Sequence, residues 1–239
     1  MLVAIVLYPG FTALDAVGPY EVLRMMPDTT VRFVSHQAGP VPADSGIFVL
    51  GATHTYSEVP KPDIVLVPGS TADTLTAMAD GVLLQWLQEV HKTTTLTLSV
   101  CSGSAVLAAA GLLKGLQATT HWVAHPLLEQ FGAIPQKQQR IVESGKCITA
   151  AGVSAGIDLG LMVAMKLHGK AVAEKIQLLI EYDPMPPTDA GHPTKAPEDV
   201  MRIARKEMLI AAQNKLNAVS IPKILWRKVI DKVRRSYPV

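Results

Sequence analysis

The stretch "TLTLSVCSGSAVLAAAG", residues 95–111, passes from a continuous apolar run into small residues at helical spacing, with one cysteine at the junction. The run 95–100 is short and rich in Thr, Leu and Val, which is typical of a strand buried on both faces of a parallel sheet. Residues 104–115 have the periodicity of a helix. The serine and glycine after the cysteine are small enough for a sharp turn. The stretch therefore predicts a strand–Cys101–helix unit, which resembles the turn that carries the nucleophile in many hydrolases.

Similar runs recur along the chain and define the fold class. Further continuous apolar runs that predict buried strands lie at 2–8, 31–35 and 63–68. Helical periodicity marks 82–92, 104–115 and 153–169, while turns and alternation predict a small ribbon within 39–59 and a hairpin over 140–152. This alternation predicts an α/β fold built on a doubly wound, mostly parallel sheet flanked by helices.

Ligands of such sheets bind beyond the carboxyl ends of the strands, where Cys101 falls. A thiol at a helix N-terminus is stabilised as the thiolate, so we expect a lowered pKa for Cys101. Asp15 follows the first strand among apolar neighbours, and Gly69, Ser70 and Gly103 are placed to present backbone N–H groups to an anion. Two structural interpretations without a catalytic role stay open. Cys101 is then an inert buried cysteine, and Asp15 only caps the helix that follows the first strand.

Composition limits the class of protein. The chain has 239 residues, 49% hydrophobic and 18% charged, and we expect one domain over 1–239. The apolar runs are too short for a membrane span, and the first residues lack the features of a signal peptide, so a cytoplasmic protein is expected. Cys101 and Cys147 are expected to stay reduced, with Cys147 unreactive. No His, Cys and carboxylate residues share metal-ligand spacing, so we expect no metal and no cofactor.

Charge is distributed unevenly. Residues 195–239 hold 11 Lys/Arg and 4 Asp/Glu, although the whole chain carries only +2. Apolar residues recur at helical spacing within this segment, so we interpret it as a basic helical extension packed on the domain. It is also too short for a tandem helix-turn-helix module. We therefore expect no nucleic-acid partner.

Several motifs together resemble one superfamily. The blocks are "LYPGFTALDAVGPYEVL" (7–23), "DIVLVPGS" (63–70), "SVCSGSAVLAAAGLL" (99–113), "ATTHW" (118–122), "AGVSAGIDLGL" (151–161) and "QLLIEYDPMPPTDAGHP" (177–193). They resemble the ThiJ/PfpI superfamily, and within it the isonitrile hydratase branch, over residues 1 to about 215. The resemblance implies a class I glutamine amidotransferase-like, flavodoxin-like sandwich.

The resemblance also implies roles for single residues. Cys101 matches the nucleophile, Asp15 matches the acidic partner of the hydratase-like branch, and Ser102 stands where that branch has threonine. Gly69-Ser70 replaces a common Gly-Gly pair, which reduces the backbone freedom of the second position. The implied function is a hydro-lyase that converts isonitriles, as small-molecule substrates, to N-substituted formamides through a thioimidate on Cys101. A homodimer is implied as well.

Other functions stay open at this point. Peptidase-like members of the superfamily have a histidine directly after the nucleophilic cysteine. Here Ser102 follows the cysteine, which disfavours a peptidase. His121 and His125 stand near the site in sequence, but we interpret them, like His192, as packed or capping residues. A stand-alone ligand- or redox-sensing protein remains an alternative, as does a glyoxalase- or deglycase-like enzyme. Turnover of an isonitrile distinguishes these classes.

Overall fold

The main sheet has seven strands in the order β10-β11-β7-β6-β1-β2-β5. In the computed structural model, which describes residues 1–214 and residue 224, all its neighbours are parallel except the antiparallel pair β10 and β11. The strands are β1 (Leu2–Val6), β2 (Thr30–Ser35), β5 (His54–Thr55), β6 (Ile64–Val67), β7 (Leu96–Val100), β10 (Ile141–Ser144) and β11 (Cys147–Ala150). The predicted α/β fold with a mostly parallel sheet is confirmed.

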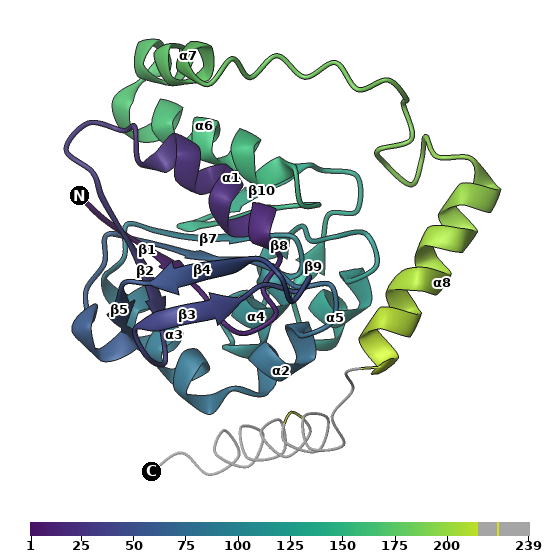
Figure 1. Cartoon of the computed structure of the whole chain (residues 1–239), viewed down its shortest axis with the longest axis horizontal. Helices are drawn as coiled ribbons and strands as arrows, with labels where there is room; N and C mark the ends of the chain where they lie inside the picture. The colour runs from purple at the N-terminus through teal and green to yellow at the C-terminus, as the bar shows by residue number, and fades with distance from the viewer. Residues whose placement is uncertain (215–223, 225–239) are drawn as a thin grey trace.

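Helices cover both faces of this sheet, α1 and α6 on one and α2, α3 and α4 on the other, and α7 packs beside α6 (Figure 1). The helices are α1 (Ala13–Leu23), α2 (Thr74–Ala79), α3 (Gly81–Thr93), α4 (Gly103–Ala109), α5 (His125–Gln130), α6 (Ala155–His168), α7 (Lys170–Leu179) and α8 (Glu198–Asn214). The remaining elements are a 3-10 turn, Tyr56–Glu58, and the strand pairs β3 (Gly39–Pro42) with β4 (Val49–Ala52) and β8 (Gln117–Ala118) with β9 (Ile134–Pro135).

Most predicted elements match the structure. The ribbon within 39–59 is the β3–β4 pair, and the hairpin over 140–152 is β10–β11, whose second arm lies beside β7. The helix predicted over 104–115 is wrong in its length, because α4 ends at Ala109. Turns follow it, with Gly111 and Gly115 both at positive φ, a conformation that glycine adopts without a steric penalty.

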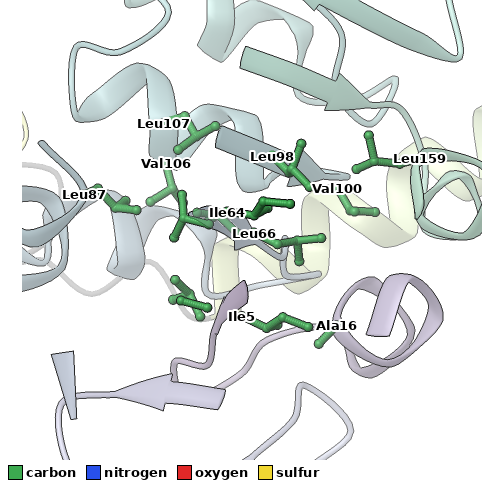
Figure 2. Close-up of a cluster of buried hydrophobic side chains, with 14 of the residues drawn as sticks. Ile5, Ala16, Ile64, Leu66, Leu87, Leu98, Val100, Val106, Leu107 and Leu159 are labelled. Carbon is green, nitrogen blue, oxygen red and sulfur yellow. The ribbon is translucent and has the colours of Figure 1, made fainter. Parts of the chain in front are cut away.

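The core lies on both faces of the central strands. Leu66, Leu98 and Val100 lie between Val106 and Leu107 of α4 on one side and α1 and α6 on the other (Figure 2). Strands β6 and β7 are buried along their whole length, which explains why their sequences are apolar without alternation.

Close packing of α1 against α6 places the first turn of α1 at the strand ends. A Cβ at Gly156 would lie 2.9 Å from Pro19 Cδ, and one at Gly160 would lie 2.8 Å from Val22 Cβ. Only glycine leaves room for this approach. Asp15, in the first turn of α1, is thereby held against the ends of the central strands.

Residues after α7 leave the main body as an extended segment and return as α8 beside α5 (Figure 1). Within the described part of the chain, no helix is both long and apolar enough to cross a bilayer. Within the helical extension expected at 195–239, residues 198–214 form α8, and the second half of the segment, apart from residue 224, lies outside the described residues. The single domain over 1–239 stays a prediction.

Candidate active site

Cys101 directly follows β7 and lies in the turn that leads into α4, as the sequence predicts. Its φ is +56°, a left-handed conformation that costs a non-glycine residue free energy. The strained backbone is fixed on both sides: the Cys101 N–H donates to Ala150 O (3.2 Å), and its carbonyl accepts from Thr120 Oγ1 (3.0 Å) and Ser104 Oγ (3.3 Å). Neighbouring elements thus hold the cysteine in a sharp strand-to-helix turn of the kind that carries the nucleophile in many hydrolases.

Two of the glycines predicted at the site permit close backbone contact. A Cβ at Gly103 would lie 2.1 Å from Val67 O, and one at Gly69 would lie 2.5 Å from the Ser102 amide nitrogen. The end of β6 and the start of α4 can approach each other only because both positions lack a side chain.

Asp15 is completely buried directly behind this turn. Its Oδ2 accepts a hydrogen bond from the Gly69 N–H (2.8 Å), and its Oδ1 has no hydrogen-bond partner among the described residues. The N-cap residue of α1 is Thr12, and the Asp15 carboxylate accepts its hydrogen bond from the loop after β6. The interpretation of Asp15 as a helix cap is therefore wrong. Burial raises the pKa of Asp15 to about 7, although the Gly69 amide and the Cys101 side chain oppose the rise.

The thiol pKa differs from the expectation. Burial, followed by the negative charge of Asp15, raises the pKa of Cys101 well above its usual value. Hydrogen bonds from the amide and hydroxyl of Ser102 favour the thiolate but do not offset these effects. The prediction of a lowered pKa is therefore wrong, because desolvation and a neighbouring carboxyl outweigh a helix terminus. Cys101 and Asp15 act on each other and titrate as a pair.

The Ser102 hydroxyl closes a ring of hydrogen bonds beside the cysteine. It accepts from the Ser70 N–H (3.0 Å) and lies 2.6 Å from Thr74 Oγ1, which in turn donates to Ser70 O (2.9 Å). Sequence reasoning missed Thr74, although a hydroxyl four residues after Ser70, near the end of a strand, is a signal that can be searched for. The ring fixes the orientation of the Ser102 hydroxyl.

Ser70 does not need the flexibility of the glycine that it replaces. It is absent from the described non-glycine residues with positive φ, and its Oγ donates to Gly10 O (2.5 Å) while accepting from the amides of Ala72 (3.2 Å) and Asp73 (2.8 Å). The side chain therefore orders the loop after β6. The amides of Gly69 and Ser70 already donate to Asp15 and Ser102, so neither is a free oxyanion donor in this state.

A cavity of about 200 Å³ opens in front of Cys101. It is lined by Ser70, Thr71, Ala72, Thr74, Leu75, Cys101, Ser102, His121, Val123, Ala124, Leu127, Met208, Leu209 and Ala212. Polar groups surround the thiol and apolar side chains form much of the remaining wall. Asp15 and Gly103 lie behind this lining and outside it.

His121 reaches the cavity, whereas His125 and His192 line an adjacent groove of about 570 Å³. Burial, with a smaller contribution from His125, lowers the pKa of His121 to about 4, so its ring is neutral near pH 7. Its Nδ1 has no partner in the described part of the chain. The interpretation of His121 as a merely packed residue is incomplete, because His121 lines both the cavity in front of Cys101 and the adjacent groove.

The second cysteine lies elsewhere. Cys147 is in β11, its Sγ–H 3.9 Å from Leu112 O, and burial raises its pKa to about 11. Across residues 1–214 and 224, no group of three or more His, Cys, Asp or Glu side chains is arranged to hold a metal ion.

Comparisons with known proteins agree with this architecture. The model of the DJ-1/PfpI family matches residues 1–166. Isonitrile hydratase of Pseudomonas putida is 41% identical over 204 residues, covering 85% of this chain and 88% of that protein. The transcriptional regulator CdhR of Pseudomonas aeruginosa is 31% identical over 71% of this chain, but only 52% of the regulator is covered.

A solved structure extends the similarity to the fold. The crystal structure of a ThiJ/PfpI family protein from Pseudomonas syringae superposes with a TM-score of 0.85 at 35% identity, over 90% of this chain and 88% of that one. The turn at Cys101, the order of the strands and these similarities all support the same family assignment. The chain belongs to the DJ-1/PfpI family, in the branch that contains isonitrile hydratase.

Proposed function

We propose that this protein hydrates isonitriles to N-substituted formamides, with Cys101 as the nucleophile. The observation that carries the proposal is the buried pair of Cys101 and Asp15, each of which shifts the pKa of the other, at the end of a small cavity. Similarity to an isonitrile hydratase over 85% of the chain supports the same reaction.

The first step adds sulfur and hydrogen to the same carbon. The terminal carbon of R–N≡C becomes electrophilic as it receives a proton, so nucleophile and acid must lie side by side. The Cys101–Asp15 pair, when it holds one proton, offers both. The C–S bond forms while the proton moves to that carbon, which gives the thioimidate R–N=CH–S–Cys101 and leaves Asp15 as a carboxylate.

The second step consumes water. Water adds to the C=N carbon, and the proton that it loses passes through the Asp15 carboxylate to the nitrogen. The adduct R–NH–CH(OH)–S–Cys101 then breaks its C–S bond and releases R–NH–CHO, and its hydroxyl proton returns to the Cys101–Asp15 pair, which again holds one proton. The Asp15 carboxylate takes a proton from the attacking water, and Ser102, whose hydroxyl lines the cavity, orients that water. The raised pKa of Asp15, about 7, suits a group that donates a proton and later accepts one.

Formamide production from tert-butyl isonitrile by the pure protein tests the proposal. Cys101→Ala is expected to abolish turnover, and Asp15→Asn to reduce it by roughly 10²- to 10⁴-fold, the usual range for loss of an acid–base group. Cys147→Ala is the matched control and should retain activity. Wild-type rates for Asp15→Asn across the neutral pH range would show that the proton comes from another group.

A sensing function is the second candidate. It is favoured by the similarity to the regulator CdhR, which shares this part of its chain, and by the ligand-sized cavity. In that case Cys101 is oxidised reversibly or contacts a ligand without turnover. Wild-type protein that binds isonitriles or is reversibly oxidised, but forms no formamide, would favour sensing over catalysis. A glyoxalase- or deglycase-like activity would instead appear as consumption of an α-oxoaldehyde.

A cytoplasmic homodimer is the proposed working form. Free thiols at both cysteines suit a reducing compartment. Exposed apolar side chains lie in the last turn of α7 and in the segment after it, where Leu178 is 80% exposed and Met185 is 86% exposed, and they support self-association. Light scattering at micromolar concentration is expected to give the dimer mass, and a monomer mass would contradict the assignment.

A further inference from the structure

Helix α8 supplies part of the wall of the cavity in front of Cys101. Met208, Leu209 and Ala212 line that cavity, although they lie more than one hundred residues after the cysteine in the sequence. Figure 1 shows α8 at the side of the fold near α5, which contributes Leu127 to the same wall. The site therefore has an outer wall that the sheet and its flanking helices do not provide.

Trp122 anchors α8 over the site. The guanidinium of Arg205 lies over the Trp122 ring, 5.4 Å from its centroid, a geometry typical of a cation–π contact. Trp122 also shares a small cavity of about 100 Å³ with residues of the first turns of α8, Val200, Met201 and Ala204. The ring of the adjacent His121, which lines the same cavity as Cys101, lies 5.7 Å from the Trp122 ring. The position of α8 is thus tied to residues next to the reacting group.

The cavity has a polar and an apolar part. Ser102 follows Cys101 directly and lies 2.6 Å from Thr74 Oγ1, so polar groups gather near the thiol, whereas Leu75, Leu127 and Met208 contribute apolar side chains to the lining. An isonitrile places its terminal carbon at the sulfur, so its substituent R must lie toward the apolar wall. A volume of about 200 Å³ is smaller than the roughly 300–1,000 Å³ of pockets for drug-sized ligands. An apolar cavity of about 150 Å³ holds benzene, so the space here suits a substituent of one ring.

We propose that α8, through Met208, sets the size of the substituent that the site accepts and restricts it to compact apolar groups of at most one ring. This inference rests on the proposed function for the identity of the substrate. The wall itself is a property of the cavity, whichever reaction takes place there. Met208 is therefore a specificity-determining residue and takes no part in the chemistry.

The first test compares two substrates. Cyclohexyl isonitrile and 2-naphthyl isonitrile are assayed with wild type, Met208→Ala, Met208→Trp and the control Glu207→Ala, which changes an exposed neighbour outside the cavity lining. Met208→Ala is expected to raise the naphthyl-to-cyclohexyl ratio of kcat/KM by roughly 10- to 100-fold, the usual effect of adding or removing apolar volume in a pocket. Met208→Trp is expected to lower the ratio.

The second test does not require turnover. Alkylation of Cys101 by iodoacetamide and by N-(2-naphthyl)iodoacetamide, followed by peptide mass spectrometry, gives a ratio of rates that reports access through the same wall. This ratio should rise in Met208→Ala, fall in Met208→Trp and stay unchanged in Glu207→Ala.

The outcomes separate the two proposals. If the alkylation ratio changes as expected in the two Met208 variants while wild type hydrates no isonitrile, then Met208 does limit the size of the cavity and the proposed reaction is wrong. If isonitriles are hydrated but both ratios in the two Met208 variants stay at the wild-type value, α8 does not control access and this inference is overturned. Because the variants change volume in opposite directions, destabilisation of one alone cannot mimic the expected pair of shifts.

Discussion

Replacing Asp15 with asparagine should stabilise the protein at neutral and alkaline pH. The folded-state pKa of Asp15 is raised from 3.8 to about 7, mainly by burial, so the folded protein resists ionisation of this group. Stability is then greatest below the unfolded-state pKa, falls as pH rises from about 4 to about 7, and is level above that. A shift of roughly three units at about 1.36 kcal/mol each makes the full loss about 4 kcal/mol. Asparagine keeps the shape of the side chain and has no charge to desolvate.

Urea denaturation at pH 5 and pH 8 measures this effect. More than half of this loss falls between pH 5 and pH 8, so the free energy of unfolding of Asp15→Asn relative to wild type should rise by roughly 3 kcal/mol over that interval. Asp183→Asn is the control, because Asp183 is an exposed carboxyl. Parallel pH profiles for wild type and Asp15→Asn would show that Asp15 ionises as easily in the fold as in the unfolded chain, and the burial argument would fail.

Three further predictions concern the turn around the cysteine. Iodoacetamide should alkylate Cys101 faster than Cys147 in the native protein, because Cys101 lines the cavity of about 200 Å³ whereas Cys147 is buried in β11. The rate should increase with pH because the pKa of the Cys101 thiol is raised, and equal labelling of the two cysteines, read by peptide mass spectrometry, would contradict this. Ser102→Ala should cost roughly 1–3 kcal/mol in thermal or urea unfolding, because it leaves a buried amide without an acceptor, and should reduce turnover less than loss of the nucleophile does. Gly103→Ala should destabilise by on the order of 3 kcal/mol or more, since its Cβ would meet the Val67 carbonyl oxygen, and wild-type unfolding would refute that contact.

Local sequence patterns predicted the elements that carry the site. The apolar run before Cys101 and the small residues after it predict a strand, a sharp turn and a helix, because buried parallel strands and helices have different periodicities. The same reasoning placed Asp15 and Gly69 at neighbouring strand ends, since the carboxyl ends of parallel strands share one edge of the sheet. The end of α4 was misplaced, because a glycine at positive φ ended the helix earlier than its apolar pattern suggested.

Tertiary structure decided the electrostatics of the site. Sequence alone placed Cys101 at a helix N-terminus and so favoured a low thiol pKa, but pKa depends on solvent exclusion and on charges brought close by folding. Only the fold buries Asp15 against the thiol, and that contact reverses the expected direction.

The outer wall of the cavity is likewise a tertiary property. The apolar spacing of residues 198–214 predicted a helix with one face packed against the domain. It contained no information on which part of the domain that face contacts. The contact of Arg205 with Trp122 ties α8 to the fold, and Met208 lines the same cavity as Cys101 although the two residues lie more than one hundred positions apart in sequence. The sequence thus determined the strand–cysteine–helix turn, because its causes are local, whereas the protonation of the nucleophile and the size of its cavity follow from contacts between distant segments.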